Sequence, residues 1–141
     1  MKAVLASLVL FALVAATHQA AAQGGQESVV TIYNVAAGKH LDFLKWMAEN
    51  EAVAKEAGAP AAQWYVHHNG AGWDYISITP RLGASEQEVM DKKIDDLMKK
   101  KGLPTGMAGS LKFRQFVSNH SDTFAGGPYG AADLVKMAEG K

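Results

Sequence analysis

The sequence predicts one α+β domain in which strands and helices follow one another in the order β-α-β-β-α-β. Two features of the chain lead to this fold class. Short runs rich in β-branched and aromatic residues alternate with longer stretches whose apolar residues recur at helical spacing, and glycines or prolines separate them. The length of 141 residues fits one domain, and a hydrophobic content of 48% excludes a disordered chain.

The first strand and the first helix have the clearest patterns. Residues 28–35 are mostly β-branched or aromatic, which is typical of a strand. Residues 40–57 are predicted to form a helix because Phe43 and Met47 share one face, and Gly58 ends it. Four charged residues of this helix are expected on the side that faces water: Glu49, Glu51, Lys55 and Glu56.

Two further strands are predicted to form a hairpin. Residues 62–68 and 73–79 alternate in the manner of strands, and the glycine-rich segment 69–72 is short enough for a tight turn. Both alternating sets of side chains are apolar or aromatic, since Trp64 lies on one set and Tyr65 on the other. Helices cover only one face of such a sheet, so the second face needs a partner.

A second helix, a loop and a fourth strand complete the predicted domain. Ser85 and Glu88 are expected to form a capping box at the start of the helix, which ends before Gly102. Residues 103–109 are predicted as a loop. The fourth strand is expected within residues 110–124, where apolar and polar side chains alternate.

The ends of the chain lie outside this domain, which is predicted to span residues 28–124. Residues 1–22 have the parts of a secretory signal peptide: the positive Lys2, an apolar core of 13 residues and small residues before the cleavage site. A membrane-spanning helix needs about 20 apolar residues, so no stable membrane insertion is expected after cleavage. Residues 23–27 are expected to form a flexible leader, and the tail 125–141 to carry a short helix.

Composition narrows the location and the function. The Ala-rich signal peptide is typical of bacteria, and the expected location is the periplasm or the outside of the cell. Lys plus Arg and Asp plus Glu each number 14, and the zero net charge argues against a nucleic-acid-binding protein. The absence of cysteine excludes disulfides and thiolate metal sites, and the histidines lack metal-binding spacing. No metal and no cofactor are therefore predicted.

The predicted element order is the ferredoxin-like arrangement, an antiparallel sheet with two helices on one face. Over residues 28–124 the chain resembles the dimeric α+β barrel superfamily, which includes small monooxygenases, haem-degrading enzymes and stress-responsive barrel proteins. The resemblance rests on this order and on two local pieces, Val-Ala-Ala-Gly-Lys-His at 35–40 and Gly-Trp-Asp-Tyr-Ile-Ser-Ile at 72–78. It implies a homodimer whose sheets pack face to face, and a pocket in each subunit between the sheet and the helices.

His120 and Asp122 are the candidate catalytic residues. They lie two positions apart near the end of the fourth predicted strand, so their side chains share a face and Asp122 can orient the imidazole. Such a pair can act as a general base or hold a ligand. The alternative is a solvent-exposed polar strand end, and the sequence leaves both interpretations open.

Five residues are candidates for the wall of a ligand pocket: Tyr33, Asn34, Trp64, His67 and Trp73. The aromatic side chains suit a planar ligand, with core packing as the alternative that is favoured for the tryptophans. Asn34 stands out because packing does not require an amide near the end of a strand. His67 and His68 point to opposite faces of the predicted strand, so at most one of them faces a pocket.

The leading functional hypothesis is a secreted homodimer that binds a small, partly aromatic ligand, and whether it adds cofactor-free monooxygenase-like or acid–base chemistry stays open. The first alternative is a non-catalytic periplasmic stress or interaction protein in which the aromatic residues only pack. The second is a haem-binding or haem-degrading protein. For that role the resemblance implies an Asn on the first strand, which Asn34 matches, and an iron-ligating His on a helix, which residues 85–101 lack.

Overall fold

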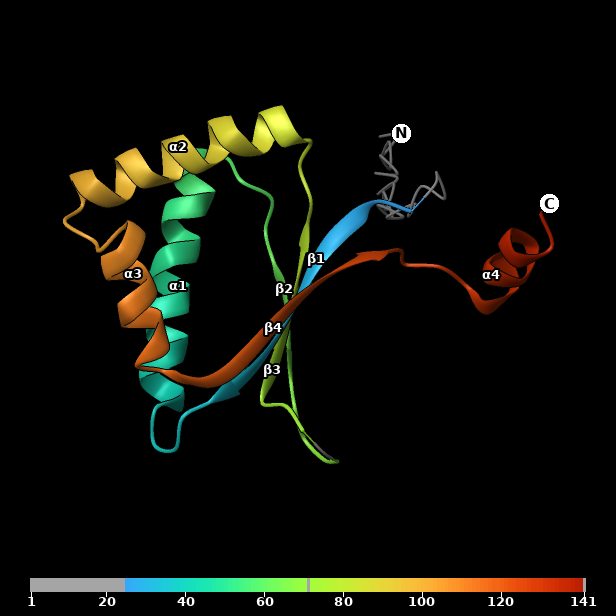
Figure 1. Cartoon of the computed structure of the whole chain (residues 1–141), viewed down its shortest axis with the longest axis horizontal. Coiled ribbons are helices and arrows are strands. Elements are labelled where there is room, and N and C mark those ends of the chain that lie inside the picture. The colour runs from blue at the N-terminus through green and yellow to red at the C-terminus, as the bar shows by residue number, and fades with distance from the viewer. Residues whose placement is uncertain (1–24, 71, 141) are drawn as a thin grey trace, which may run out of the picture.

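The computed structural model describes residues 25–70 and 72–140, and the predicted signal peptide at 1–22 lies outside this described part. Within these residues, four strands and four helices follow one another along the chain (Figure 1). Their bounds are β1 Glu27–Val35, α1 His40–Ala57, β2 Gln63–Val66, β3 Tyr75–Pro80, α2 Ala84–Lys100, α3 Gly106–Arg114, β4 Val117–Gly126 and α4 Ala131–Ala138.

The four strands form one sheet in the order β2-β3-β1-β4. Every neighbouring pair is antiparallel, and the register of central strand β1 places Tyr33 opposite Tyr75 of β3 and His120 of β4. Residues opposite one another share a face of the sheet. This topology is the ferredoxin-like arrangement, so the predicted α+β fold class is confirmed.

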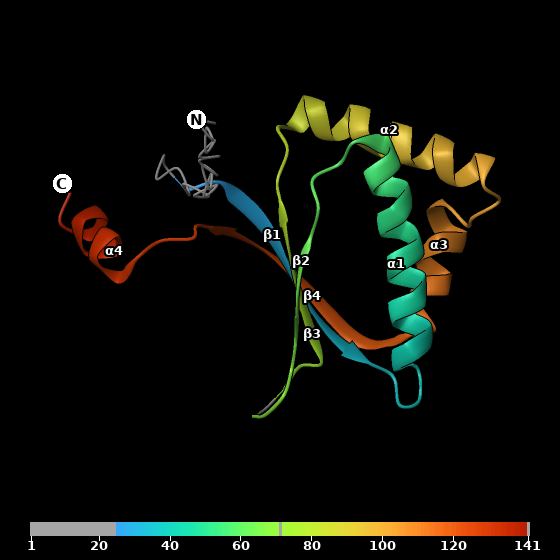
Figure 2. The same cartoon turned by 180° about the vertical axis from the view of Figure 1, so that it is seen from behind.

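Three helices gather on one side of the sheet, whereas α4 stands apart at the end of a C-terminal arm (Figure 1, Figure 2). Helix α1 runs alongside the sheet, α2 crosses the C-terminal end of α1, and α3 lies beside α1. No helix of the described chain covers the opposite face of the sheet. None of the described helices is both long and apolar enough to cross a membrane.

The buried core lies between β1, the N-terminal half of α1 and the junction of α3 with β4. It consists of Tyr33, Val35, Phe43 and Phe116. Phe43 of α1 is fully buried, and its ring centroid lies 5.2 Å from that of Tyr33 and 5.6 Å from that of Tyr75. These rings anchor the first turns of α1 to the sheet.

Helix α3 overturns part of the sequence prediction. The sequence predicts a loop at 103–109 followed by a strand, but Gly106–Arg114 is helical and β4 begins only at Val117. Two glycines and a serine give the segment a weak intrinsic preference for helix, so its local pattern does not indicate one. Tertiary packing stabilises it instead, because the ring centroid of Phe113 lies 5.7 Å from that of Trp46 on α1.

Helix α2 begins earlier than predicted and packs loosely. Its N-cap is Gly83, whose backbone N–H donates to Oε2 of Glu86 at 3.3 Å. The predicted capping box of Ser85 and Glu88 is therefore wrong, because Ser85 already lies within the first turn. None of the residues of α2 is buried, which leaves space between this helix and the sheet.

Candidate functional site

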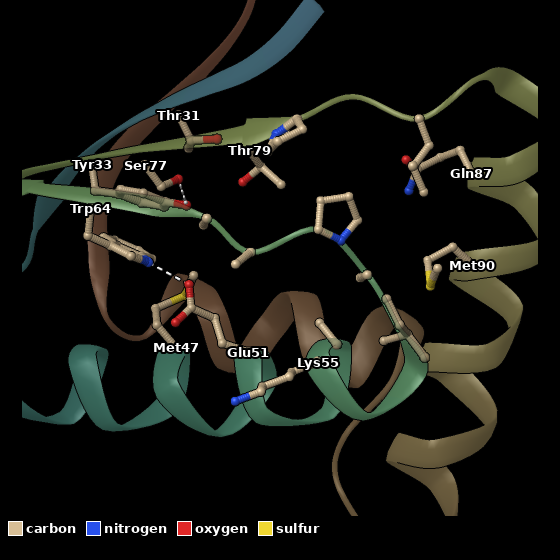
Figure 3. Close-up of a pocket in the computed structure, with 18 residues that line it drawn as sticks. Thr31, Tyr33, Met47, Glu51, Lys55, Trp64, Ser77, Thr79, Gln87 and Met90 are labelled. Carbon is tan, nitrogen blue, oxygen red and sulfur yellow. Dashed lines mark hydrogen bonds between the residues drawn. The ribbon is translucent and has the colours of Figure 1, made fainter. Parts of the chain in front are cut away.

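A cavity of about 480 Å³ lies between the sheet, the C-terminal half of α1 and helix α2 (Figure 3). Its position follows from the loose packing of α2, which crosses the end of α1 and does not lie flat on the strands. The residues that line it are Thr31, Tyr33, Met47, Glu51, Ala54, Lys55, residues 59–62, Trp64, Ser77, Thr79, Pro80, Leu82, Gln87, Met90 and Ile94.

One end of the cavity is polar. The hydroxyl of Tyr33 shares a hydrogen bond of 3.2 Å with Oγ of Ser77. Beside it, Nε1 of Trp64 donates to Oε1 of Glu51 at 2.5 Å, which ties the sheet to α1. Figure 3 shows that both aromatic side chains turn their polar atoms toward the same end of the cavity. The arrangement collects hydroxyl, indole and carboxylate groups in one place.

A third hydrogen bond links this polar end to the edge strand β4. Oγ1 of Thr31 donates to Oδ1 of Asp122 at 2.7 Å. Burial raises the pKa of the Tyr33 phenol above 10.0; the hydrogen bonds to Ser77 and Thr31 oppose this shift, and the charges of Asp122 and Glu51 add to it. Tyr33 is therefore a neutral phenol at neutral pH, able to donate or accept a hydrogen bond.

The opposite end of the cavity is apolar. It is formed by the segment 59–62, which carries three alanines and a proline, and by Met90 and Ile94 of α2. Gly58 ends α1 in the left-handed conformation, with φ of 90°, and its N–H bonds the last turn. The chain then turns back toward β2. Because the side chains of this segment are small, they leave the cavity unfilled.

Two of the described residues that line the cavity are charged, and their charged groups point in different directions. Figure 3 shows the carboxylate of Glu51 turned toward Trp64, whereas the ammonium end of Lys55 points away along the outside of α1. The sequence places Glu51 on the water-facing side of the helix, and that expectation is wrong. Phe43, Met47 and Glu51 are spaced by four residues, so the helical period itself puts them on one face.

Of the five predicted pocket residues, Tyr33 and Trp64 line the cavity and the other three do not. Asn34, near the end of β1, points to the face of the sheet opposite to that of Tyr33. There its Nδ2 donates to the carbonyl oxygen of Gly72 at 2.8 Å. Trp73 packs on His67, with ring centroids 4.9 Å apart. These three residues tie down the tip of the hairpin.

The histidine pairs expected from the sequence lie elsewhere. Strand β2 ends at Val66, so the predicted strand end at residue 68 is wrong, and His67 and His68 follow the strand. His120 and Asp122 do lie close together, with 3.8 Å between Nε2 and Oδ2. They stand on the exposed edge strand, where His120 packs against Phe113, and neither side chain lines the cavity. Asp122 reaches the cavity only through Thr31.

Sequence reasoning missed the small hydroxyl residues of the site. Thr31, Ser77 and Thr79 alternate with Ile32, Ile76 and Ile78, and the register pairs Thr31 with Ser77. Their recurrence at every second position puts these three side chains on one face of the sheet, and this alternation is the signal in the sequence that sets them apart from the isoleucines. Across the described residues no group of three or more His, Asp or Glu side chains is placed to hold a metal ion.

The comparisons with known proteins identify the fold. No protein-family model matches the sequence, and no curated protein matches it significantly. Solved structures do match. A NIPSNAP family protein from Agrobacterium tumefaciens is 15% identical, with a TM-score of 0.53, over 75% of this chain and 95% of that chain. An uncharacterized NIPSNAP domain protein from Burkholderia xenovorans is 13% identical, with a TM-score of 0.51, over 74% of this chain and 96% of that chain.

At such low identities the likeness establishes the fold alone. The expected resemblance to ferredoxin-like α+β barrel proteins is confirmed at that level, and the arrangement of this chain's own cavity must carry any functional conclusion.

Proposed function

We propose that the chain is a homodimeric, secreted or periplasmic domain that holds a small organic ligand in the cavity between the sheet, α1 and α2. The observation that carries this proposal is the cavity of about 480 Å³ with a polar end at Tyr33, Ser77 and Glu51 and an apolar end at α2. Ligand sites have this character: concave, mostly apolar, with a few convergent polar groups. The ligand that fits it is amphipathic.

The rival function, a non-catalytic interaction protein without a ligand, needs the aromatic side chains to fill the hollow. Tyr33 and Trp64 stack on one another, with ring centroids 5.4 Å apart, at one end of the cavity and leave the rest of it open. The site therefore favours ligand binding. Acid–base chemistry by His120 and Asp122 is less well supported, because neither side chain reaches the cavity.

Haem does not fit this site. None of the described lining residues is a histidine, and helix α2 has none in its sequence. Asn34, the residue matched by resemblance, hydrogen-bonds Gly72 away from the cavity. We derive no role for haem from this chain.

A second copy of the chain is the proposed cover for the other face of the sheet. The register places Val30 beside Ile78 and Ile32 beside Ile76 on the face that no described helix covers. Tyr65 on the neighbouring strand is 49% exposed. A contiguous apolar strip of this kind is typical of an interaction surface, and packing of two such sheets gives a homodimer.

Substitution on this strip tests the dimer. Ile32→Glu places a charge in the middle of the strip and is expected to give single subunits in sedimentation velocity, because an unpaired charge cannot be buried between two sheets. Lys93→Glu changes a charge on the exposed surface of α2 and is the control that stays dimeric. A parent protein that sediments as a single subunit would contradict the dimer.

Native mass spectrometry of protein purified from its source tests the ligand site. The expected spectrum shows a dimer with a co-purified small molecule. Ala54→Phe fills the cavity from α1 and is expected to remove the bound mass, whereas Ala52→Phe, on the exposed side of the same helix, keeps it. Circular dichroism checks that both variants are folded. A folded Ala54→Phe variant that retains the small molecule would place the ligand elsewhere.

A further inference from the structure

We infer that the ligand of this cavity carries a cationic amine, bound by Glu51, on an apolar tail. The inference rests on the proposed function and names the class of molecule that the site takes. It starts from Glu51, the one charged group among the described lining residues that faces the cavity at its polar end. The other charged lining residue, Lys55, directs its ammonium group away (Figure 3).

The carboxylate of Glu51 is held in place by a hydrogen bond to one of its two oxygens. Trp64 donates its indole N–H to Oε1, which fixes the carboxylate against the sheet. Among the described residues none is hydrogen-bonded to the second oxygen, Oε2, which can accept a hydrogen bond from a ligand. The indole N–H of Trp64 is a neutral donor, so it supplies no opposite charge to the carboxylate. An ammonium group is the partner that supplies both charge and hydrogen bonds.

The neighbouring groups favour the same choice. The hydroxyl oxygens of Tyr33, Ser77 and Thr31 can accept hydrogen bonds, and an ammonium group has three donors to offer. Behind Thr31 stands a second carboxylate, Asp122, 2.7 Å from its hydroxyl. The potential at this end is therefore negative, which repels a carboxylate or phosphate headgroup and attracts a cation.

The residues that line the rest of the cavity determine which tail the ligand can carry. Pro60, Met90 and Ile94 line the end away from Glu51, so the part of the ligand that lies there is apolar. Methionine side chains adapt to differently shaped apolar groups, which suits an alkyl or aromatic tail alike. A primary amine on a hydrocarbon chain satisfies both ends of the cavity at once.

Three probes of matched length separate charge from shape: hexylamine, hexanol and hexanoate, titrated by calorimetry at neutral pH into the full-length parent protein. Hexylamine is expected to bind about 10- to 100-fold more tightly than hexanol, the range that corresponds to one hydrogen bond to a charged group. Hexanoate is expected to bind more weakly than hexanol. Glu51→Gln removes the charge and is expected to abolish the preference for hexylamine, whereas Glu49→Gln, outside the lining, keeps it.

The outcomes distinguish this inference from the proposed function. If hexanol binds as tightly as hexylamine, or hexanoate binds best, the amine inference fails while the ligand site stands. If none of the three binds, both fail. Glu51→Asp keeps the charge and is expected to retain part of the preference, which shows whether loss in Glu51→Gln reflects charge and not a disturbed fold. A Glu51→Gln variant with an undiminished preference would also overturn the assignment.

Discussion

The helix-facing side of the sheet has a packed half and a hollow half, and β1 runs through both. In the packed half, Tyr33 and Val35 are buried beneath Phe43 of α1. In the hollow half, Thr31 of the same strand faces a cavity. Helix α1 borders both halves, but the side chains of the sheet beneath it differ between them.

Two antiparallel strands change from large to small side chains at the same place. The register sets Tyr33 beside Tyr75 in the packed half and Thr31 beside Ser77 next to it. The two strands run in opposite directions. Side chains therefore go from small to large along β1, from Thr31 to Tyr33, and from large to small along β3, from Tyr75 to Ser77, and the small ones meet in one hollow. Aromatic rings fill the space under the start of α1, and hydroxyl groups leave it open under the end. The comparison teaches that side-chain volume at paired positions of the sheet, together with the loose packing of α2, creates this site.

The packed half is expected to dominate stability. Phe43→Ala removes a ring that is fully buried between Tyr33 and Tyr75, and it is expected to lower the free energy of unfolding by about 3–5 kcal/mol. Urea unfolding at a fixed subunit concentration measures the loss. Leu41→Ala, at a position 63% exposed on the same helix, is the control and is expected to change it by less than about 0.5 kcal/mol. A loss below about 1 kcal/mol for Phe43→Ala would contradict the assignment of the core.

The sequence predicts most of the fold because its strongest local patterns agree with the tertiary structure. Helix α1 has the predicted bounds, set by the periodic apolar face and by Gly58. Strand β1 begins at Glu27, one residue before its predicted start. Helix α3 could not be predicted, because the packing of Phe113 on Trp46 outweighs a weak helical preference, and that contact depends on residues far apart in the chain.

The site is less predictable than the fold for a physical reason. Tyr33 and Trp64 could be named as aromatic candidates, but a cavity is space that side chains fail to fill, and no residue type encodes it. Glu51 was assigned to solvent because carboxylates are rarely buried without a partner. Its partner, the indole N–H of Trp64, lies 13 positions away and becomes visible only when α1 packs on β2.

Tyr33 lies at the border of the two halves, and removal of its hydroxyl group tests how much the polar end of the cavity contributes to stability. Tyr33→Phe keeps the ring, removes the hydrogen bond to Ser77, and is expected to lower the free energy of unfolding by about 1 kcal/mol. The change also affects pH dependence. The pKa of Tyr33 is raised by burial, so the folded state favours the neutral phenol; this stabilisation is complete below pH 10.0 and is lost as the pH rises through the folded-state pKa.

Chemical unfolding at neutral and at strongly alkaline pH measures this effect. The parent protein is expected to lose more stability on the alkaline side than Tyr33→Phe does. Tyr129→Phe, between β4 and α4 and outside both the buried core and the cavity, is the matched control and keeps the alkaline loss of the parent. Identical alkaline profiles for the parent and Tyr33→Phe would show that the phenol does not contribute.

The smallest change in the free energy of unfolding is expected from a methionine-to-alanine substitution in the hollow half, which can be compared with the same substitution in the packed half. Met47 packs against the buried core as well as lining the cavity, whereas Met90 of α2 borders the hollow on a helix with no buried residue. Met90→Ala is expected to lower the free energy of unfolding by about 0.5–1 kcal/mol, because enlarging an open cavity removes few contacts. Met47→Ala is expected to cost more, since it leaves a void beside packed rings. Equal losses in urea unfolding would mean that α2 is packed as tightly as α1, and the distinction between a packed half and a hollow half would then fail.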